Sequence, residues 1–413
     1  MFKVIKEKNL GSSLGKQEID ILIEVIKKKN TLTRGPYLEK FEKIFAKMCG
    51  SKYAVAVSSC TAALKISTQL LRLKQGDEVI VQANAFWKTV VALVEKKVLL
   101  KIVDVNKNNF QMSFEDLQNK ITRKTKAVYL VTMGGSTDNI EKIHNFCKNR
   151  NIPLIQDCAH SVFYKLNNKP PGNFADINCF SFSTLKNITT LGEGGMITTD
   201  REIFADEAKK LRDGWPIGKF VKYEYNYQKN FFSKPINTNF LKPGDYFYHD
   251  WKTLEEVGST YKMNDAQAAV GIVQLKKLQF FLKKRKKISN LYNNFLKKYS
   301  FFKLQKYSSK LLSSYHLYSF FVEKNNYFDR DNFVERLEKK YNLILTNRYW
   351  PIHMHPILRL KKHKIGEAKN FEEIYFKKQI DLPISAIMSL KEAREVIKRL
   401  KICVDSFRED KIN

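Results

Sequence analysis

The sequence predicts an α/β protein with a mostly parallel sheet. Short apolar runs of strand length alternate with amphipathic runs of helical length between residues 53 and 199. This alternation is typical of a sheet flanked by the helices that connect its strands. A chain of 413 residues is also long enough for a large core and a second domain.

Residues 1–30 are expected to form an N-terminal arm with a helix from Lys16 to Lys29. Gly35-Pro36 then interrupts the chain before a second helix, Tyr37–Cys49. The expected strands are Tyr53–Val57, Glu78–Gln82, Leu99–Val103, Ala127–Thr132, Pro153–Gln156, Ile177–Phe182 and Met196–Thr199. The helices expected between them are Ala62–Leu73, Val90–Glu95, Phe114–Ile121 and Ile140–Asn149.

The character of the sequence changes near residue 264. Asp265 to Tyr299 is one long amphipathic segment with few helix breakers, which indicates a helix that bridges two domains. After it we expect a β-rich stretch at Tyr315–Glu323 and helices at Arg330–Tyr341 and Leu390–Leu400. We therefore predict a large domain over residues 1–262, with an insertion at about 214–258, and a smaller α+β domain over 263–413.

The formal net charge of +31 raises the question of a nucleic-acid partner. The basic residues are spread along the whole chain, and the densest run, between residues 276 and 287, lies on one expected helix. Aromatic residues do not alternate with the basic runs, as a base-stacking surface would require. We therefore expect a solvated basic surface and no nucleic-acid partner.

The sequence shows no sign of a membrane or secreted protein. It contains no uncharged apolar run of about 18 residues, and its N-terminus lacks the apolar stretch of a signal peptide. The six cysteines are scattered without a CxxC pair, so we expect reduced thiols in the cytoplasm and neither a disulfide framework nor a metal site.

The stretch from Cys179 to Gly195 carries the strongest chemical signal. Lys186 follows an apolar, strand-like run, Ser181 precedes it by five residues, and a glycine-rich turn begins at Gly192. Asp157 ends another apolar run 29 residues upstream. In a chain so rich in lysine, Lys186 taken alone is a surface residue. With this serine and aspartate it supplies the three groups that a pyridoxal phosphate (PLP) site needs: a Schiff-base amine, a phosphate ligand and a carboxylate for the pyridine nitrogen.

Other candidates follow the expected strands. Ser59-Cys60-Thr61 lies between a strand and a helix, where backbone amides can bind a phosphate, although an ordinary helix cap fits equally. Phe86 and Trp87 could stack on a pyridine ring or belong to the core. His160, three residues after Asp157, could contact a ring oxygen or be structural. Asp157 itself would lie at the carboxyl edge of the sheet, where open α/β sheets bind ligands.

Along the chain these elements occur in one order: the Ser59 turn, Phe86, Asp157 with His160, Ser181 with Lys186, and the glycine-rich turn. In this order they resemble the DegT/DnrJ/EryC1/StrS family of PLP-dependent sugar aminotransferases, which have the aspartate aminotransferase fold (fold type I). The resemblance covers nearly the whole chain. Its segments include Leu32 to Tyr37, Ser59 to Leu64, Gly76 to Val81, Asp157-Cys158-Ala159-His160, Phe180 to Lys186, Met263 to Ala269 and Asp381-Leu382-Pro383. It implies fold type I with a seven-stranded-type sheet, and a homodimer whose two chains share each active site.

The resemblance also implies roles for single residues. Lys186 would bind PLP and move the proton during transamination, and Asp157 would pair with the pyridine nitrogen. Phe86 would stack on the ring, and His160 would stand near the ring hydroxyl. The phosphate ligands would be Ser59, Cys60, Thr61 and Ser181 of one chain and Thr260 of the other.

One departure from the family pattern and one agreement with it bear on these roles. Where the family often has an asparagine that reaches the partner's cofactor, this chain has Thr260 in Gly258-Ser259-Thr260-Tyr261-Lys262, so Thr260 or Lys262 would take that place. In dehydratases of the family a histidine replaces the lysine, so Lys186 favours transamination.

The resemblance implies an aminotransferase that moves an amino group, with L-glutamate as the expected donor, to a keto group of a nucleotide-linked deoxysugar. The product would enter a surface glycan or a glycosylated metabolite. Two alternatives remain open: a fold type I PLP enzyme with a non-nucleotide keto substrate, and a PLP-binding regulator without turnover.

Overall fold

The computed structural model describes residues 11–28, 31–135, 137, 139–214, 220–222, 247–249, 257–359 and 362–410. Its centre is a seven-stranded sheet in the order β1-β8-β7-β5-β4-β2-β3. All neighbouring pairs are parallel except those of β8, which runs antiparallel to both β7 and β1. The expected α/β class and the mostly parallel sheet are confirmed.

The seven strands lie close to their expected positions. They are β1 (Tyr53–Val57), β2 (Glu78–Gln82), β3 (Leu99–Val103), β4 (Thr125–Val131), β5 (Leu154–Asp157), β7 (Ile177–Ser181) and β8 (Gly195–Thr199). The central strands are buried on both faces, as expected for parallel strands covered by helices.

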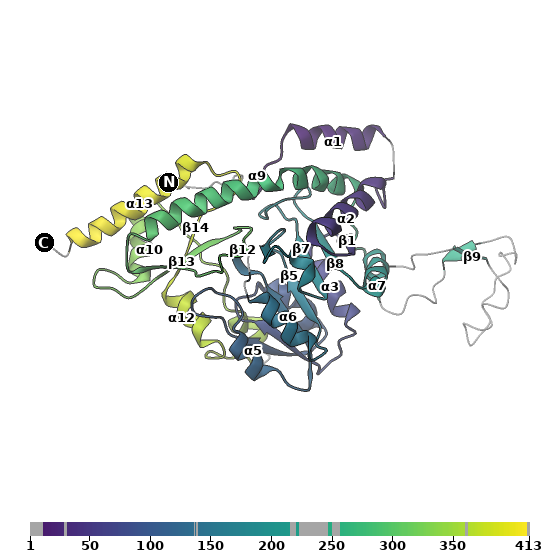
Figure 1. The fold of residues 1–413 in the computed structure, drawn as a ribbon, viewed down its shortest axis with the longest axis horizontal. Coiled ribbons are helices and arrows are strands. Elements are labelled where there is room, and N and C mark those ends of the chain that lie inside the picture. Colours follow the sequence, from purple (N-terminus) through teal and green to yellow (C-terminus); the bar gives the residue numbers. More distant parts are fainter. Residues whose placement is uncertain are drawn as a thin grey trace.

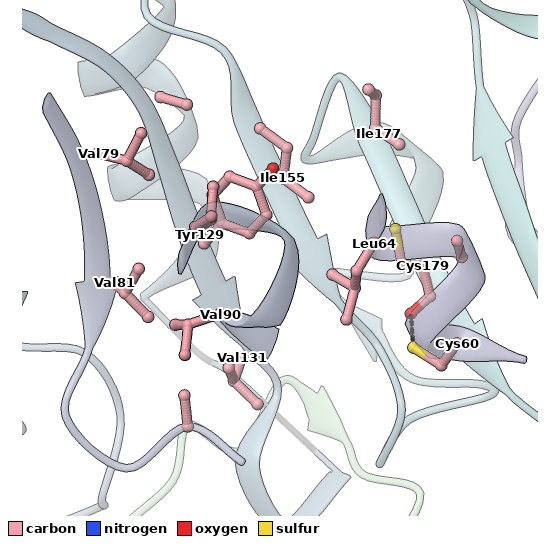
Figure 2. Packing of buried hydrophobic residues seen from close by; sticks show 14 of the residues in the cluster. Cys60, Leu64, Val79, Val81, Val90, Tyr129, Val131, Ile155, Ile177 and Cys179 are labelled. Atoms are coloured by element: carbon pink, nitrogen blue, oxygen red, sulfur yellow. Dashed lines mark hydrogen bonds between the residues drawn. The ribbon is translucent and has the colours of Figure 1, made fainter. Parts of the chain in front are cut away.

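Alternate strand residues face two different hydrophobic cores. On one face, valines and isoleucines of β1, β2, β4, β5 and β7 pack against α3 (Cys60–Leu70) and α7 (Glu202–Asp213). Figure 2 shows part of this core, with Leu64 of α3 over the strand residues Tyr129, Ile155 and Ile177. On the other face pack α5 (Phe114–Lys120), α6 (Ile140–Lys148) and α2 (Pro36–Cys49).

The long helix α9 (Asp265–Leu296) connects the sheet to the C-terminal part of the chain. It packs against α2 and α1 (Lys16–Lys27) near its start and against α13 (Leu390–Glu409) further on, as Figure 1 shows. An Asn264–Gln267 capping box fixes its first turn.

The C-terminal residues form a separate three-stranded antiparallel sheet, β11-β13-β14. Its strands are β11 (Phe302–Leu304), β13 (Tyr318–Val322) and β14 (Gln379–Leu382), packed against α10 (Arg330–Lys339), α13 and the end of α9. The C-terminal residues Phe321, Ile352 and Phe371 also join the core of the large sheet. The proposed domain boundary at residue 262 stays a prediction.

Several elements differ from the expectation. Four elements were not predicted: α7, α12 (Lys369–Lys377), β11 and β14. The first helix ends at Lys27, and α3 begins at Cys60, because the Ser59 hydroxyl caps it. α13 continues nine residues beyond the expected Leu400, since its apolar face stays buried as far as Phe407.

Smaller elements complete the described fold. The 3₁₀-helices are Trp87–Thr89, Met133–Gly135, Pro171–Asn173 and Ile352–Met354, the short helices are α4 (Val91–Glu95) and α11 (Pro356–Arg359), and β6 (Lys165–Leu166) pairs with β12 (Leu311–Leu312). Of the expected insertion at 214–258, β9 (Phe220–Lys222) pairs with β10 (Phe247–His249). Most of that insertion, and residues 1–10, lie outside the described residues. Among the described helices, none has the length and apolar character needed to cross a membrane.

Candidate active site

A cavity of about 600 Å³ opens at the carboxyl ends of the parallel strands. Residues that follow β1, β2, β5 and β7 meet there with four residues from the C-terminal third of the chain, His316, Arg348, Tyr349 and Ile384. The cavity lining includes the sequence candidates Ser59, Cys60, Thr61, Phe86, Asp157, His160, Ser181 and Lys186. This is the edge at which open α/β sheets bind ligands.

The N-terminus of α3 forms one wall of the cavity. The Ser59 hydroxyl accepts a hydrogen bond from the amide of Ala62 at 3.1 Å. The amides of Cys60 and Thr61, which line the cavity, have no acceptor among the described residues. Gly195 of β8 lies against this turn, and a Cβ there would stand 2.4 Å from the Ser59 carbonyl carbon. Free amides at a helix N-terminus are suited to an anion.

Asp157 ends β5 with its carboxylate buried beside this wall. Oδ2 accepts a hydrogen bond from the Thr89 hydroxyl at 2.7 Å, and Oδ1 accepts one from the amide of Ala159 at 3.0 Å. The Cys60 thiol is a third donor, with 3.8 Å between sulfur and Oδ1. Burial raises the pKa of Asp157, while these donors and Lys186 act in the opposite direction.

Lys186 lies in the loop between β7 and β8. Its amide donates to the Ser183 carbonyl at 2.9 Å, and its side chain lines the cavity. Burial lowers the pKa of Lys186 from 10.5 to about 8, and the Asp157 carboxylate partly opposes this shift. An amine with this pKa is partly neutral near pH 7, as nucleophilic attack on a carbonyl requires.

His160, His316 and Tyr349 form a group of neighbouring rings. His160 lies 4.4 Å from His316 and 5.6 Å from Tyr349 between ring centroids, and its Nε2 stands 3.3 Å from the Tyr349 hydroxyl. Burial holds the pKa of both histidines well below its usual range, so both rings are neutral near pH 7. Nδ1 of His160 is buried and has no hydrogen-bond partner among the described residues.

The aromatic pair after β2 is divided between two environments. Phe86 lines the cavity, whereas Trp87 stacks on His355 at 5.9 Å and is not part of the lining. Thr260 is exposed and also lies outside the lining. Its neighbour Tyr261 accepts a hydrogen bond from the amide of Ser58 at 2.7 Å, so this segment runs beside the turn that precedes α3.

The sequence did not single out two residues that the fold brings to this site, Thr89 and His316. Thr89 could have been suggested by its place three residues after Phe86 and by the need of a buried aspartate for a donor. His316 carries no such signal, because it reaches the cavity only through the packing of the C-terminal part. The amide of Arg348 is held by Asp381 Oδ2 at 2.8 Å.

The arrangement combines a lysine of lowered pKa, a buried carboxylate and an anion-binding helix N-terminus around one cavity. It favours chemistry on a phosphorylated carbonyl compound. No group of three or more potential metal ligands occurs among the described residues.

Comparison with known proteins agrees with this arrangement. Residues 12–401 match the model of the DegT/DnrJ/EryC1/StrS aminotransferase family. The spore coat polysaccharide biosynthesis protein SpsC of Bacillus subtilis is 29% identical over 394 residues, covering 94% of each chain. GDP-perosamine synthase of Vibrio cholerae is 30% identical over 262 residues, covering 63% of each chain.

A solved structure shares the fold. NtdA of Bacillus subtilis, determined with bound PMP, aligns with a TM-score of 0.76 at 24% identity, over 97% of this chain and 83% of its own. The match of the family model covers nearly the whole sequence, including Asp157 and Lys186. The protein belongs to the DegT/DnrJ/EryC1/StrS aminotransferase family.

Proposed function

We propose that the protein is a PLP-dependent aminotransferase that transfers an amino group from L-glutamate to a keto group of a nucleotide-linked deoxysugar. The observation that carries this proposal is the meeting of Lys186, Asp157 and the N-terminus of α3 in one cavity. The relatives named for GDP-perosamine synthesis and spore coat polysaccharide biosynthesis support the substrate class and a role in surface-glycan synthesis or that of a glycosylated metabolite.

The cavity residues fit PLP in charge and position. Asp157 would hold the pyridine nitrogen, Phe86 would cover a ring face, and His160 would stand at the ring hydroxyl through its unpartnered Nδ1. The amides of Cys60 and Thr61 and the hydroxyl of Ser181 would hold the phosphate, with Ser59 keeping the turn in shape. When bound, PLP would supply an electron sink for the carbon that exchanges its amine.

Lys186 would carry the cofactor and move a proton during amine exchange. Its lowered pKa allows the side-chain nitrogen to give up and accept a proton near neutral pH. The Asp157 carboxylate stabilises the charged form of this amine, so the two groups are coupled.

Arg348 is suited to the carboxylate of an amino-acid donor. Its side chain lines the cavity, and its positive charge is close enough to lower the pKa of Lys186 and His160. Among the described residues no carboxylate lies within ion-pair distance of its guanidinium. A guanidinium binds a carboxylate through two parallel hydrogen bonds.

We further propose a homodimer in the cytoplasm. The outer face of α1 exposes Ile19, Ile23 and Ile26 at helical spacing, an apolar stripe that a second chain could cover. Thr260 is exposed, as a residue that contacts the partner's cofactor would be before assembly. All six cysteines are buried and unpaired, which is typical of a reducing compartment.

The first test is the absorption spectrum of the purified protein before and after adding L-glutamate. We expect a visible band from bound PLP that shifts on conversion to PMP. The Lys186→Ala variant should lose this response, while Lys398→Ala, at an exposed lysine of α13, should keep it. A protein that cannot be reconstituted with PLP contradicts the proposal.

Two further outcomes separate the alternatives. A band that no amino donor changes would favour a PLP-binding regulator. A normal response to glutamate, followed by amine transfer only to keto compounds without a nucleotide, would favour the non-nucleotide substrate.

A further inference from the structure

Arg285 of α9 is a buried cation that the proposed amine exchange does not use. Only 1% of the residue is exposed, and among the described residues no carboxylate pairs with its guanidinium. Burial lowers the pKa of Arg285 from 12.5 to about 10, so the side chain stays charged near pH 7. Because a buried charge is costly unless it is hydrogen-bonded, the acceptors of this guanidinium show what it holds.

The acceptors of Arg285 are backbone carbonyls at the cavity. Nη1 donates to the carbonyl oxygens of Tyr315, His316 and Ile384, each at 3.2 Å. Two of these residues, His316 and Ile384, line the cavity. One guanidinium nitrogen therefore connects two parts of the cavity wall that lie far apart in the sequence.

These carbonyls lie just beyond the paired end of the small sheet. Tyr318 of β13 and Leu382 of β14 face each other as the last pair of the ladder on that side. The residues before Tyr318 and those after Leu382 continue toward the cavity, where the ladder no longer joins the two strands. Arg285 reaches both continuations from α9 and donates to each of them.

The segment around Tyr315 also contacts the residues next to the active-site lysine. The buried side-chain amide of Asn187, which follows Lys186, donates to the Ser314 carbonyl at 2.9 Å. The Ser314 hydroxyl donates to the His160 carbonyl at 2.6 Å. Tyr315 itself has a φ of 48°, which a bulky side chain rarely adopts and which persists only where the surroundings hold it.

We propose that Arg285 is a positioning residue for the amine exchange, because its guanidinium fixes His316 and Ile384 in the wall of the cavity. The inference rests on the proposed function. In that proposal the PLP ligands of the same chain lie between residues 59 and 186, so the wall from the C-terminal part is left to the two substrates. Arg285 would therefore affect the response to substrate and leave the affinity for PLP unchanged.

The first test needs no cofactor and uses hydrogen exchange of the apo protein, followed by mass spectrometry. The amides of Ser314 and His316 donate to the Gly135 and Gly134 carbonyls, each at 2.9 Å. We expect Arg285→Met to speed exchange of these two amides tenfold or more, because their segment loses its hold on α9. Arg285→Lys, which keeps the charge on a shorter donor, should show a smaller increase.

Tyr292→Phe is the matched control. Tyr292 is also a buried residue of α9, and its hydroxyl donates to the carbonyl of Pro383, next to Ile384, at 2.8 Å. The control removes a hydrogen bond from the same helix to the same continuation of β14 but leaves the segment 314–316 untouched. Exchange at Ser314 and His316 that is no faster in Arg285→Met than in Tyr292→Phe overturns the inference.

The second test measures the glutamate response of the PLP-loaded variants. We expect the maximal rate divided by the half-saturating glutamate concentration to fall tenfold or more in Arg285→Met. PLP affinity should stay within threefold of the wild type, and Arg285→Lys should recover part of the loss. A residue that only stabilises the fold would lower the midpoint of urea unfolding and leave the glutamate response of the folded protein unchanged.

The outcomes separate this inference from the proposed function. A wild type that binds PLP and does not respond to glutamate contradicts the proposed function itself. A responding wild type, with an unchanged response in Arg285→Met or an equal loss of PLP affinity, overturns only the positioning role. If Arg285→Met does not fold, Arg285→Lys decides, with an expected loss of threefold or more relative to Tyr292→Phe.

Discussion

Asp157 and Asp381 are buried aspartates in two different sheets, and burial raises the pKa of both. Asp157 accepts from Thr89, Ala159 and Cys60 and still lines the cavity opposite Lys186. Asp381 accepts from the side chain of Gln379 and the amide of Arg348 and is not part of the lining.

The difference between the two shows that burial alone does not make a carboxylate catalytic. Asp157 lines the cavity and interacts with the charged form of Lys186. Asp381 instead accepts a hydrogen bond from the backbone amide of Arg348 and holds that segment in place. We therefore expect a charge change at Asp157 to affect the chemistry and the same change at Asp381 to affect mainly stability.

The largest effect is expected from Asp157→Asn. The substitution keeps the shape but removes the charge that would hold the ring nitrogen protonated. We expect the rate of the glutamate-driven spectral change to fall on the order of 10²–10³-fold, the usual result of removing one preorganised electrostatic group. Stopped-flow absorbance measures it, and a loss no greater than that of Asp381→Asn would contradict the assignment.

Asp381→Asn should instead change how stability depends on pH. The pKa of Asp381 is raised from 3.8 to about 6, so between these values the native state binds more protons than the unfolded chain. This contribution to stability is complete below pH 3.8 and is lost as pH rises through about 6. Relative to Asp381→Asn, the wild type should lose about 3 kcal/mol across this range. Urea unfolding of the apo protein at several pH values measures the difference, and parallel pH profiles would disprove it.

Substitutions at Thr89 test how far the hydrogen bond from its hydroxyl sets the pKa of Asp157 and the affinity for PLP. Thr89→Val removes the hydroxyl that donates to Oδ2 at 2.7 Å and should raise the pKa of Asp157 further. A hydrogen bond to a charged group contributes about 1.5–3 kcal/mol, so we expect PLP to bind tenfold or more weakly. Thr89→Ser should restore affinity in a PLP titration of the apo protein. Equal affinities of the Val and Ser variants would show that only the shape at position 89 matters.

The smallest expected effect is a shift in the pH dependence of PLP attachment to the apo protein. Attachment needs the neutral amine of Lys186, so its rate should rise with pH up to about 8, the pKa of that amine, and then level off. Since the Asp157 carboxylate raises this pKa, the break should move to lower pH in Asp157→Asn and stay in place in Asp381→Asn. The observed rate of absorbance change between pH 6 and 9 measures it, and an equal shift in both variants would remove the distinction between the two aspartates.

The sequence by itself determined the large sheet and the centre of the site. All seven strands were expected from their apolar runs, because burial on both faces makes such runs continuous and easy to recognise. Asp157 ends a parallel strand, so the carboxyl-edge rule predicts that it lies where open α/β sheets bind ligands, and the structure places it there. The roles of the site residues remain predictions until the variants are measured.

Only the tertiary structure decided the rest of the cavity. β8 runs antiparallel to β7 and brings Gly195 against Ser59. The loop between β7 and β8 carries Lys186. His316, Arg348 and Tyr349 reach the cavity from the C-terminal part, and α12 and β14 of that part were not predicted from the sequence. Local periodicity records which face of an element is buried, but contacts between residues more than a hundred positions apart depend on how whole elements pack.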